Sequence, residues 1–152
     1  MSSAGFAAYG SHFRLSEDSD DVGRGAGIGW SDVHTRSELT LGSAQLGMTS
    51  CAQGPWECKQ MERHRTTTEV LVCTNAPIVL AVAPPTQGPA PMAAQVEAFT
   101  LERGDVVILE PGVWHDACRG RDSATSYLWI AGRVPESDAA WVDLLDGPVV
   151  IG

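Results

Sequence analysis

The sequence has little positive charge and lacks a long apolar run. Its 10 lysine and arginine residues are outnumbered by 19 aspartate and glutamate residues, which gives a formal net charge of −9. Such a surface repels phosphate backbones and anionic lipids, so we expect binding neither to nucleic acid nor to a membrane surface. The longest apolar stretch, around residues 77–85, is far too short to span a bilayer. Residues 1–10 also lack the basic region and apolar core of a signal peptide, which predicts a cytoplasmic protein.

The cysteine pattern excludes the common structural zinc sites. The four cysteines include no CxxC pair and none of the spacings typical of such sites. Cys73 and Cys118 lie in or beside apolar stretches, where a thiol behaves as a small buried hydrophobe. We therefore expect reduced cysteines and no disulfide framework.

The composition is that of one globular, β-rich domain. A chain of 152 residues has the size of a single domain and buries enough surface to fold without disulfides or metal. Nine prolines and 16 glycines indicate many turns between short elements. Segments with alternating or continuous apolar residues predict strands at 37–46, 56–65, 69–74, 78–82, 96–101, 106–109 and 126–131. The sequence thus predicts an all-β fold, a single β-barrel.

The two ends of the chain are predicted to be less regular than the middle. We expect one helical turn within residues 4–10, a loop over 16–29, and a short helix over 136–143. In that last helix, Ser137 would be the N-cap and Trp141 would pack inward. The single domain, residues 1–152, is accordingly divided into an N-terminal cap (1–36), a barrel (37–134) and a C-terminal tail (135–152).

Two short segments carry the candidate chemistry. In a strand, side chains alternate, so Glu62 and His64 would share one face and present oxygen and nitrogen to one metal ion or substrate. Glu69 would join them only if the three threonines before it turn or bulge. His115 follows a buried strand and a Pro-Gly turn, so it would complete the site from a second strand.

Each of these residues also has a purely structural interpretation. Glu62 and His64 could form a solvated pair at a sheet edge, and Glu69 could be an exposed strand residue. His115 could be a core histidine bonded to a backbone carbonyl. His12 and His34 show no partner pattern and are expected on the surface.

Taken in order, the two segments resemble the two-part signature of the cupin superfamily. Glu62-x-His64-x4-Glu69 resembles its His-x-His-x3,4-Glu motif, with Glu62 in place of the first histidine. Gly104 to His115 resembles its Gly-x5-Pro-x-Gly-x2-His motif, although the proline and glycine are adjacent here and six residues separate Gly104 from the proline. The resemblance implies a double-stranded β-helix with short terminal helices. It also implies a divalent metal, Ni, Mn, Fe or Zn, held by Glu62, His64, Glu69 and His115.

Further stretches are similar to the ureidoglycolate lyase family within that superfamily. They follow the order and approximate spacing of the family over most of residues 4–131, and the Met-Glu-Arg-His and Gly-x-Trp-His pieces are the most specific. The matching stretches are residues 6–10, 61–64, 77–85, 96–99 and 112–115. Two departures concern the substrate. Asp116 stands where many members have a second histidine, and after Val134 there is no acidic or histidine-bearing tail of the family type, only Asp143, Asp146 and a terminal apolar stretch.

The family resemblance implies a lyase of allantoin degradation in purine catabolism. Such an enzyme cleaves the carbinolamide ureidoglycolate, a small anionic hydroxy-acid, into glyoxylate and urea. That reaction needs a base for the hydroxyl proton and an acid for the leaving nitrogen, and His115, Glu62 and His64 are the catalytic candidates. His115 would serve either as a base or as a metal ligand. Candidate substrate-binding residues are Arg63, Arg65, Arg119 and Trp114.

Two other functions suit the same residues. A cupin isomerase or epimerase would bind a sugar acid or hydroxy-acid and move a proton beside a carbonyl, because one barrel hosts many reactions. A non-catalytic cupin would bind a metabolite in the same cavity without turnover. Cupin-like barrels commonly pair through exchanged strands or sheet edges, so the resemblance also implies a homodimer.

Overall fold

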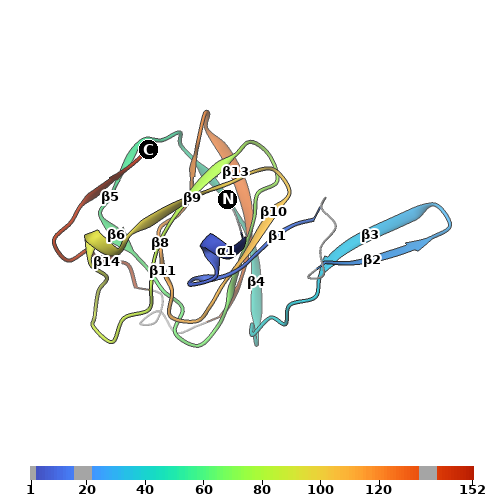
Figure 1. The fold of residues 1–152 in the computed structure, drawn as a ribbon, viewed down its shortest axis with the longest axis horizontal. Helices are drawn as coiled ribbons and strands as arrows, with labels where there is room; N and C mark the ends of the chain where they lie inside the picture. The colour runs from blue at the N-terminus through green and yellow to red at the C-terminus, as the bar shows by residue number, and fades with distance from the viewer. Residues whose placement is uncertain (1–2, 16–21, 134–139) are drawn as a thin grey trace.

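A computed structural model describes residues 3–15, 22–133 and 140–152, and its regular structure is almost entirely β-strand (Figure 1). The prediction of an all-β fold is confirmed. In chain order the elements are α1 (Ser3–Phe6), β1 (Gly10–Arg14), β2 (Val22–Gly27), β3 (Trp30–Thr35), β4 (Ala44–Cys51), β5 (Trp56–Cys58), β6 (Gln60–Met61), β7 (Glu69–Val72), β8 (Ile78–Ala83), the 3-10 turn η1 (Ala93–Gln95), β9 (Glu97–Leu101), β10 (Asp105–Leu109), β11 (Trp114–His115), β12 (Arg119–Gly120), β13 (Thr125–Gly132), β14 (Val142–Asp143) and β15 (Val149–Ile151).

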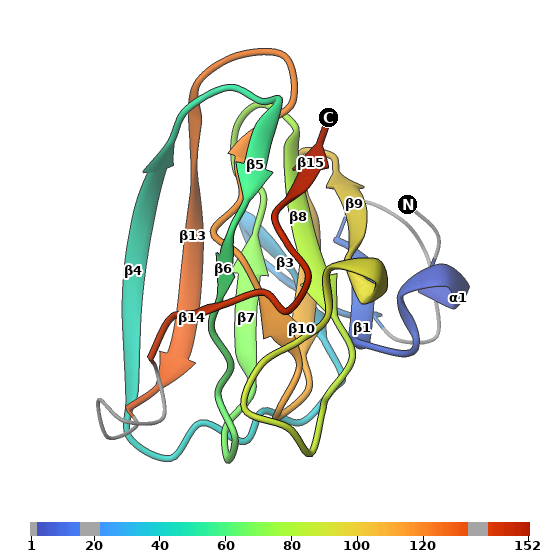
Figure 2. The ribbon, with the colours of Figure 1, turned by 90° about the vertical axis from the view of Figure 1, so that its left-hand side faces the viewer.

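Two antiparallel sheets enclose the main core. One has five strands in the order β1-β10-β7-β13-β4, and the other joins β11, β8, β12 and β9 (Figure 2). The largest apolar cluster draws on both, with Leu71 and Val107 from the first sheet and Leu80 and Leu101 from the second. The strands predicted around residues 69–74, 78–82, 96–101, 106–109 and 126–131 are all present. Their apolar side chains have a shared interior to fill, which is why the pattern identifies them.

β1 lies within the predicted N-terminal cap but pairs with β10 along its whole length, from Gly10↔Leu109 to Arg14↔Asp105. This pairing brings His12 within 3.4 Å of the buried carboxylate of Asp105, and the His12 side chain is only 7% exposed. Arg14 donates to the same carboxylate through Nε at 2.7 Å. The expectation that His12 is a surface residue is therefore wrong, because its segment is a strand of the main sheet.

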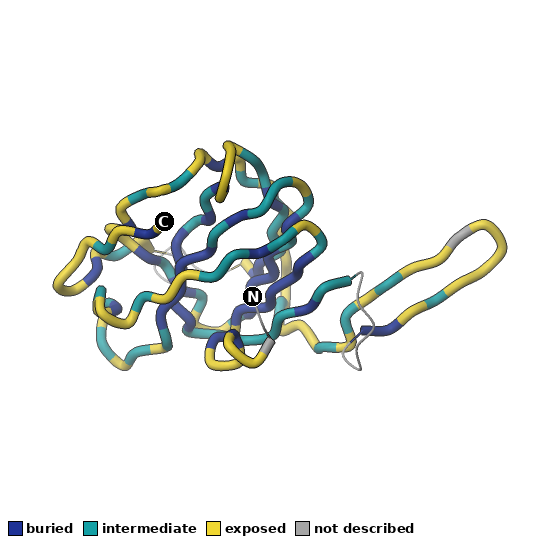
Figure 3. The backbone as a smooth tube through the Cα atoms, turned by 45° about the horizontal axis from the view of Figure 1, so that its top comes forward, coloured by how far each residue is buried: buried dark blue, intermediate teal, exposed yellow. Residues whose placement is uncertain are grey.

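The prediction of a loop over residues 16–29 is wrong for the second half of that segment. β2 and β3 form a hairpin over Val22–Thr35 that projects from the rest of the chain, and most of its residues are exposed (Figures 1 and 3). Glycines alternate along β2, so the apolar periodicity that marks a strand is missing. The glycines still pair through their backbones, and the imidazole of His34 lies over Gly23, where a side chain would collide with it.

The chain end is also more extended than predicted. β14 contains the last two residues of the predicted helix 136–143, and it pairs with β6. Ser137, the predicted N-cap, lies outside the described residues. Trp141 is exposed and lines a cavity instead of packing inward. β15 pairs with β5, so both strands of the tail flank the segment that leads to Glu62.

The outer face of the five-stranded sheet carries two rows of apolar residues. Directly paired side chains form one row through Met48, Leu128, Val72, Val106 and Phe13, and a second through Leu46, Ile130, Val70 and Ile108. Val22 and Val33 of the hairpin pack on this face near β1, β10 and β7, whereas Leu46 is 70% exposed on β4.

Within the described residues, no helix has the length and apolar character needed to cross a bilayer.

Candidate active site

Glu62 and His115 are held opposite each other by the backbone. The amide of Glu62 donates to the carbonyl of His115 at 3.0 Å, and the amide of His115 donates to the carbonyl of Glu62 at 2.9 Å. Residues that exchange both hydrogen bonds are direct partners, so their side chains lie on the same face of the pair. Glu62 Oε1 is 3.9 Å from His115 Nε2.

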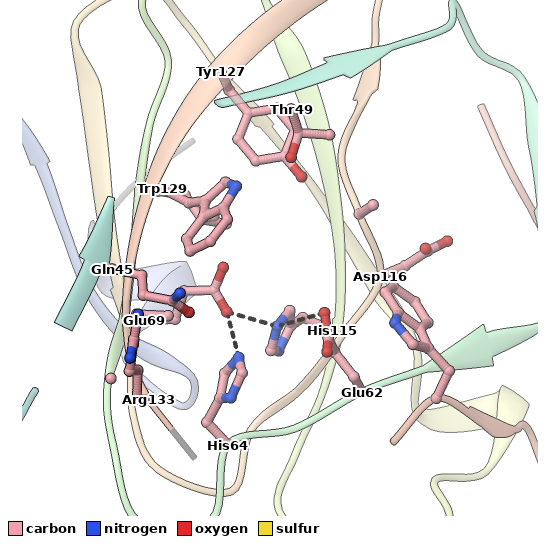
Figure 4. Close-up of a pocket in the computed structure, with 15 residues that line it drawn as sticks. Gln45, Thr49, Glu62, His64, Glu69, His115, Asp116, Tyr127, Trp129 and Arg133 are labelled. Atoms are coloured by element: carbon pink, nitrogen blue, oxygen red, sulfur yellow. Dashed lines mark hydrogen bonds and ion pairs between the residues drawn. The ribbon is translucent and has the colours of Figure 1, made fainter. Parts of the chain in front are cut away.

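His64 and Glu69 reach the same place because the chain bends between them. Strand pairing ends at Glu62, and residues 65–67 form a bend before β7 starts at Glu69. Glu69 Oε2 lies 2.9 Å from His64 Nε2 and also 2.9 Å from His115 Nε2 (Figure 4). The bend that the sequence required for Glu69 to join the group is thus present in the structure.

The orientation of the His115 ring is set by its second nitrogen. Nδ1 lies 3.2 Å from the carbonyl oxygen of Val113, and this acceptor assigns the Nδ1 proton to that hydrogen bond. Nε2 therefore faces Glu69 and Glu62. It is buried and has no well-aligned hydrogen bond within the described residues, so it is available to a ligand.

The local charges separate the pKa values of these groups. Burial by itself lowers the pKa of His115, but the charge and contact of Glu69, the charge of Glu62 and the Val113 carbonyl together outweigh it and raise that pKa from 6.5 to about 9. Burial raises the pKa of Glu69, yet the charge of His115 and the contacts with both imidazoles lower it to about 2. For Glu62, burial dominates and its pKa is raised. His115 and Glu69 accordingly form an imidazolium–carboxylate pair in the metal-free protein.

These side chains also fit a divalent metal ion. One donor atom from each of Glu62, His64 and His115 lies within 4.8 Å of the other two. Imidazole nitrogen and carboxylate oxygen suit ions such as Ni, Mn, Fe or Zn. The available Nε2 of His115 supports this interpretation, and the Glu69 carboxylate touches both imidazoles.

One part of a cavity of about 480 Å³ is lined by Glu62, His64, Glu69 and His115. Much of the rest of its wall is the inner face of β4, β7 and β13, where side chains point inward at every second residue (Figure 4), and Asp116, Ala117 and Trp141 also line it. Ala131 lies at the centre of this wall. Its partners on the adjacent strands are Glu69 and Gln45. Along its own chain, Trp129 lies two residues before it and Arg133 two residues after it. The small side chain of Ala131 leaves room for a ligand among these four.

The sequence model of one protein family, described as ureidoglycolate lyase, matches residues 1–149 of the chain. The chain belongs to the ureidoglycolate lyase family. This is a family of lyases in the cupin superfamily, so the predicted membership is confirmed.

No curated protein sequence matches the chain significantly. Among solved structures, it is similar to QdtA, a sugar 3,4-ketoisomerase from Thermoanaerobacterium thermosaccharolyticum in complex with TDP. The TM-score is 0.48 at 10% sequence identity, covering 84% of this chain and 90% of that chain. A likeness of this size does not bear on the reaction of the ureidoglycolate lyase family member described here.

Arg63 and Trp114, which were expected to bind substrate, do not line this cavity. Arg63 is buried and donates to the carbonyls of Thr86 at 2.7 Å and Gly88 at 3.1 Å. Its guanidinium carbon lies 4.1 Å from the centre of the Trp114 ring, and Trp114 in turn donates to the Thr86 hydroxyl. Both side chains therefore bind the proline-rich loop 84–92. Arg63 faces away from Glu62 and His64, as strand alternation predicts.

Arg65 and Arg119 do not line this cavity either, although the hollow that Arg119 lines adjoins it at Asp116, Ala117 and Trp141. Arg65 is exposed, and Arg119 donates to the carbonyls of Ala117 and Cys118 and lines a neighbouring hollow. The arginine that lines the cavity is Arg133. Sequence reasoning missed it, together with Gln45, Thr49, Tyr127 and Trp129. Tyr127 and Trp129 lie in the strand predicted over residues 126–131, but both faces of that strand carry large apolar residues, so the inward face is not evident. Gln45 and Thr49 lie on β4.

Proposed function

We propose that this member of the ureidoglycolate lyase family cleaves ureidoglycolate to glyoxylate and urea in the cavity around Ala131. The family match over residues 1–149 is the observation that carries the proposal. The chemistry of the cavity supports it, since Glu62, His64, Glu69 and His115 provide proton carriers and Arg133 provides a cation. We place this reaction in allantoin degradation and in the cytoplasm.

The carboxylate of the substrate pairs with Arg133, and its hydroxyl faces the carboxylate–imidazole cluster. Arg133 directly follows the last residue of β13, two residues after Ala131 and on the same face. It is therefore the next inward-facing side chain after Ala131. Inward positions along a strand are roughly 7 Å apart, and paired strands are about 4.8 Å apart. A two-carbon acid over Ala131 therefore reaches Arg133 and Glu69 together.

The proton transfers balance with two groups of this chain. Glu62 accepts the proton of the substrate hydroxyl, and the O–H electron pair becomes the second bond of the new carbonyl. The C–N bond breaks, its electron pair goes to nitrogen, and His115 donates the proton that completes urea. The neighbouring carboxylate of Glu69 keeps His115 protonated for this step.

Glu62, His64, Glu69 and His115 are the residues that would hold a divalent ion, and with an ion bound Glu62 and His115 would be ligands instead of the base and the acid. Such an ion supplies Lewis-acid activation of the hydroxyl oxygen. The chain itself orients the donors, through the Glu62–His115 backbone pair and through the amide of Gly112, which donates to the His64 carbonyl at 2.7 Å.

The direct test is glyoxylate release from racemic ureidoglycolate, measured with chelator and with added Ni or Mn. We expect release by the wild type and its loss in His115→Ala, with circular dichroism showing that the variant is folded. Release that persists in chelator assigns the proton transfers to Glu62 and His115, whereas release only with metal assigns a resident ion. No release by the wild type under any condition contradicts the proposed reaction.

A further inference from the structure

Trp129 lies against the backbone of β4 at a position where only glycine leaves room. Gly47 is its register partner on β4. A Cβ atom built on Gly47 would lie 2.1 Å from Cζ2 and 2.2 Å from Cε2 of the indole. Gly47 needs no unusual backbone conformation, since it lies within the regular β4–β13 ladder and has no positive φ. The glycine is therefore required for space, and it fixes where the indole lies.

The indole belongs to a neutral part of the cavity wall. Its neighbours among the lining residues are Leu71 on β7, Thr49 and Gln45 on β4, and Tyr127. The Tyr127 hydroxyl accepts a hydrogen bond from the Cys118 amide at 3.3 Å. Glu69 is the partner of Ala131 on β7, and Arg133 lies two residues beyond Ala131. Figure 4 shows Trp129, Tyr127 and Thr49 apart from the carboxylate and imidazole groups of Glu69, His64 and His115. A ligand in this cavity thus meets charged groups at one end and an aromatic face at the other, and the amide of Gln45 lies between them, at the level of Ala131.

We propose that Trp129 and Gln45 form the binding subsite for the planar ureido group of the substrate. This inference rests on the proposed function and assigns the end of the cavity that holds the leaving group. A ureido group is flat and neutral, and its faces can stack on an indole ring. Its N–H donors and carbonyl acceptor match the amide of Gln45, which has both kinds of atom.

The subsite also directs the reaction. With the ureido group on Trp129 and the carboxylate on Arg133, the carbon that joins them lies over Ala131 beside Glu69. Stacking fixes rotation about the C–N bond and points the leaving nitrogen toward His115. Most of this contact exists before the bond breaks, so its loss raises KM more than it lowers kcat.

Two unreactive ligands separate this subsite from the rest of the cavity. Hydantoate is ureidoglycolate without the hydroxyl, and glycolate keeps the hydroxyl and carboxylate but lacks the ureido group. We expect Trp129→Leu to weaken hydantoate binding, measured by titration calorimetry, by about tenfold, or about 1.4 kcal/mol. Glycolate binding should change less than about twofold. Trp129→Phe should retain part of the hydantoate affinity.

Gly47→Ala is the second variant, because it displaces the indole without removing it. It should weaken hydantoate in the same direction as Trp129→Leu, while the adjacent Met48→Ala, on the outer face of the same strand, should leave both ligands unaffected. Equal weakening of both ligands, or none, in folded Trp129→Leu and Gly47→Ala overturns the subsite. If the wild type cleaves ureidoglycolate but shows that result, the subsite alone is wrong. If the wild type neither cleaves it nor binds hydantoate, the subsite and the proposed reaction are both wrong.

Discussion

The carboxylate of Glu69 and the imidazole of His115 lie 2.9 Å apart in the protein interior, although they come from strands of different sheets. Glu69 starts β7 and His115 ends β11. The pair therefore links the two sheets at the cavity, and its ionisation connects the site to the stability of the fold.

The pH dependence of stability follows from the two pKa shifts. The pKa of His115 is raised to about 9, so its contribution is complete below pH 6.5 and is lost as the pH rises through 9. The pKa of Glu69 is lowered to about 2, so its contribution is complete above pH 4.5 and is lost as the pH falls through 2. We expect urea unfolding in chelator to show stability falling above pH 6.5, by up to about 1.4 kcal/mol per pH unit. Glu69→Gln should remove most of that slope, and parallel profiles for the two proteins would contradict the ion pair.

Arg133→Gln should raise KM for ureidoglycolate by about tenfold or more with a smaller effect on kcat, because it removes a charge that contacts the substrate carboxylate. Arg119→Gln is the matched control, since Arg119 does not line this cavity and its guanidinium donates to the backbone carbonyls of Ala117 and Cys118. Steady-state glyoxylate release measures both. The opposite ranking of the two variants would return the carboxylate site to Arg119.

Arg63→Ala should destabilise the fold by about 2–3 kcal/mol, because two carbonyls of the loop 84–92 lose a charged donor and Trp114 loses its stacked guanidinium. The neighbouring Arg65 is exposed, and Arg65→Ala should change stability by less than about 0.5 kcal/mol. Chemical denaturation of the two variants makes the comparison. Equal effects would show that the buried hydrogen bonds of Arg63 contribute nothing.

The predicted homodimer has a specific candidate surface, the outer face of the five-stranded sheet. β4 is one of the two edge strands of that sheet among the described residues, it has no charged residue or proline, and Leu46 and Met48 are exposed on it. The β2–β3 hairpin stands beside this face with Ile28 fully exposed at its tip, and an isolated hairpin has little stability of its own. A second copy facing this surface would cover both features.

Leu46→Lys should therefore dissociate the dimer, lowering the mass measured by light scattering. Val150→Lys is the control, because Val150 is 71% exposed and Leu46 is 70% exposed, yet Val150 lies on β15. A monomeric wild type, or a dimer that only Val150→Lys disrupts, would show that this face is not the interface.

The amino-acid sequence by itself determined the β-rich interior and the four carboxylate and imidazole residues. Apolar runs such as those now in β8 and β10 indicate buried strands, because they are short, are bounded by turn residues and have apolar side chains on both faces. Motif spacing identified Glu62, His64, Glu69 and His115. The alternation of side chains in a strand limits which of them can share one face. The hairpin β2–β3 was missed because glycine has no side chain to show periodicity.

The tertiary structure alone decided which side chains meet those four residues. Arg63 was close to them in sequence but faces the loop 84–92, whereas Arg133 was distant and lines their cavity. That difference depends on how β13 pairs with β4 and β7, and a shift of one residue would send Trp129 and Arg133 to the outer face. Alternation within one strand gives two possible faces, and only pairing with the neighbouring strands selects the one that faces the cavity.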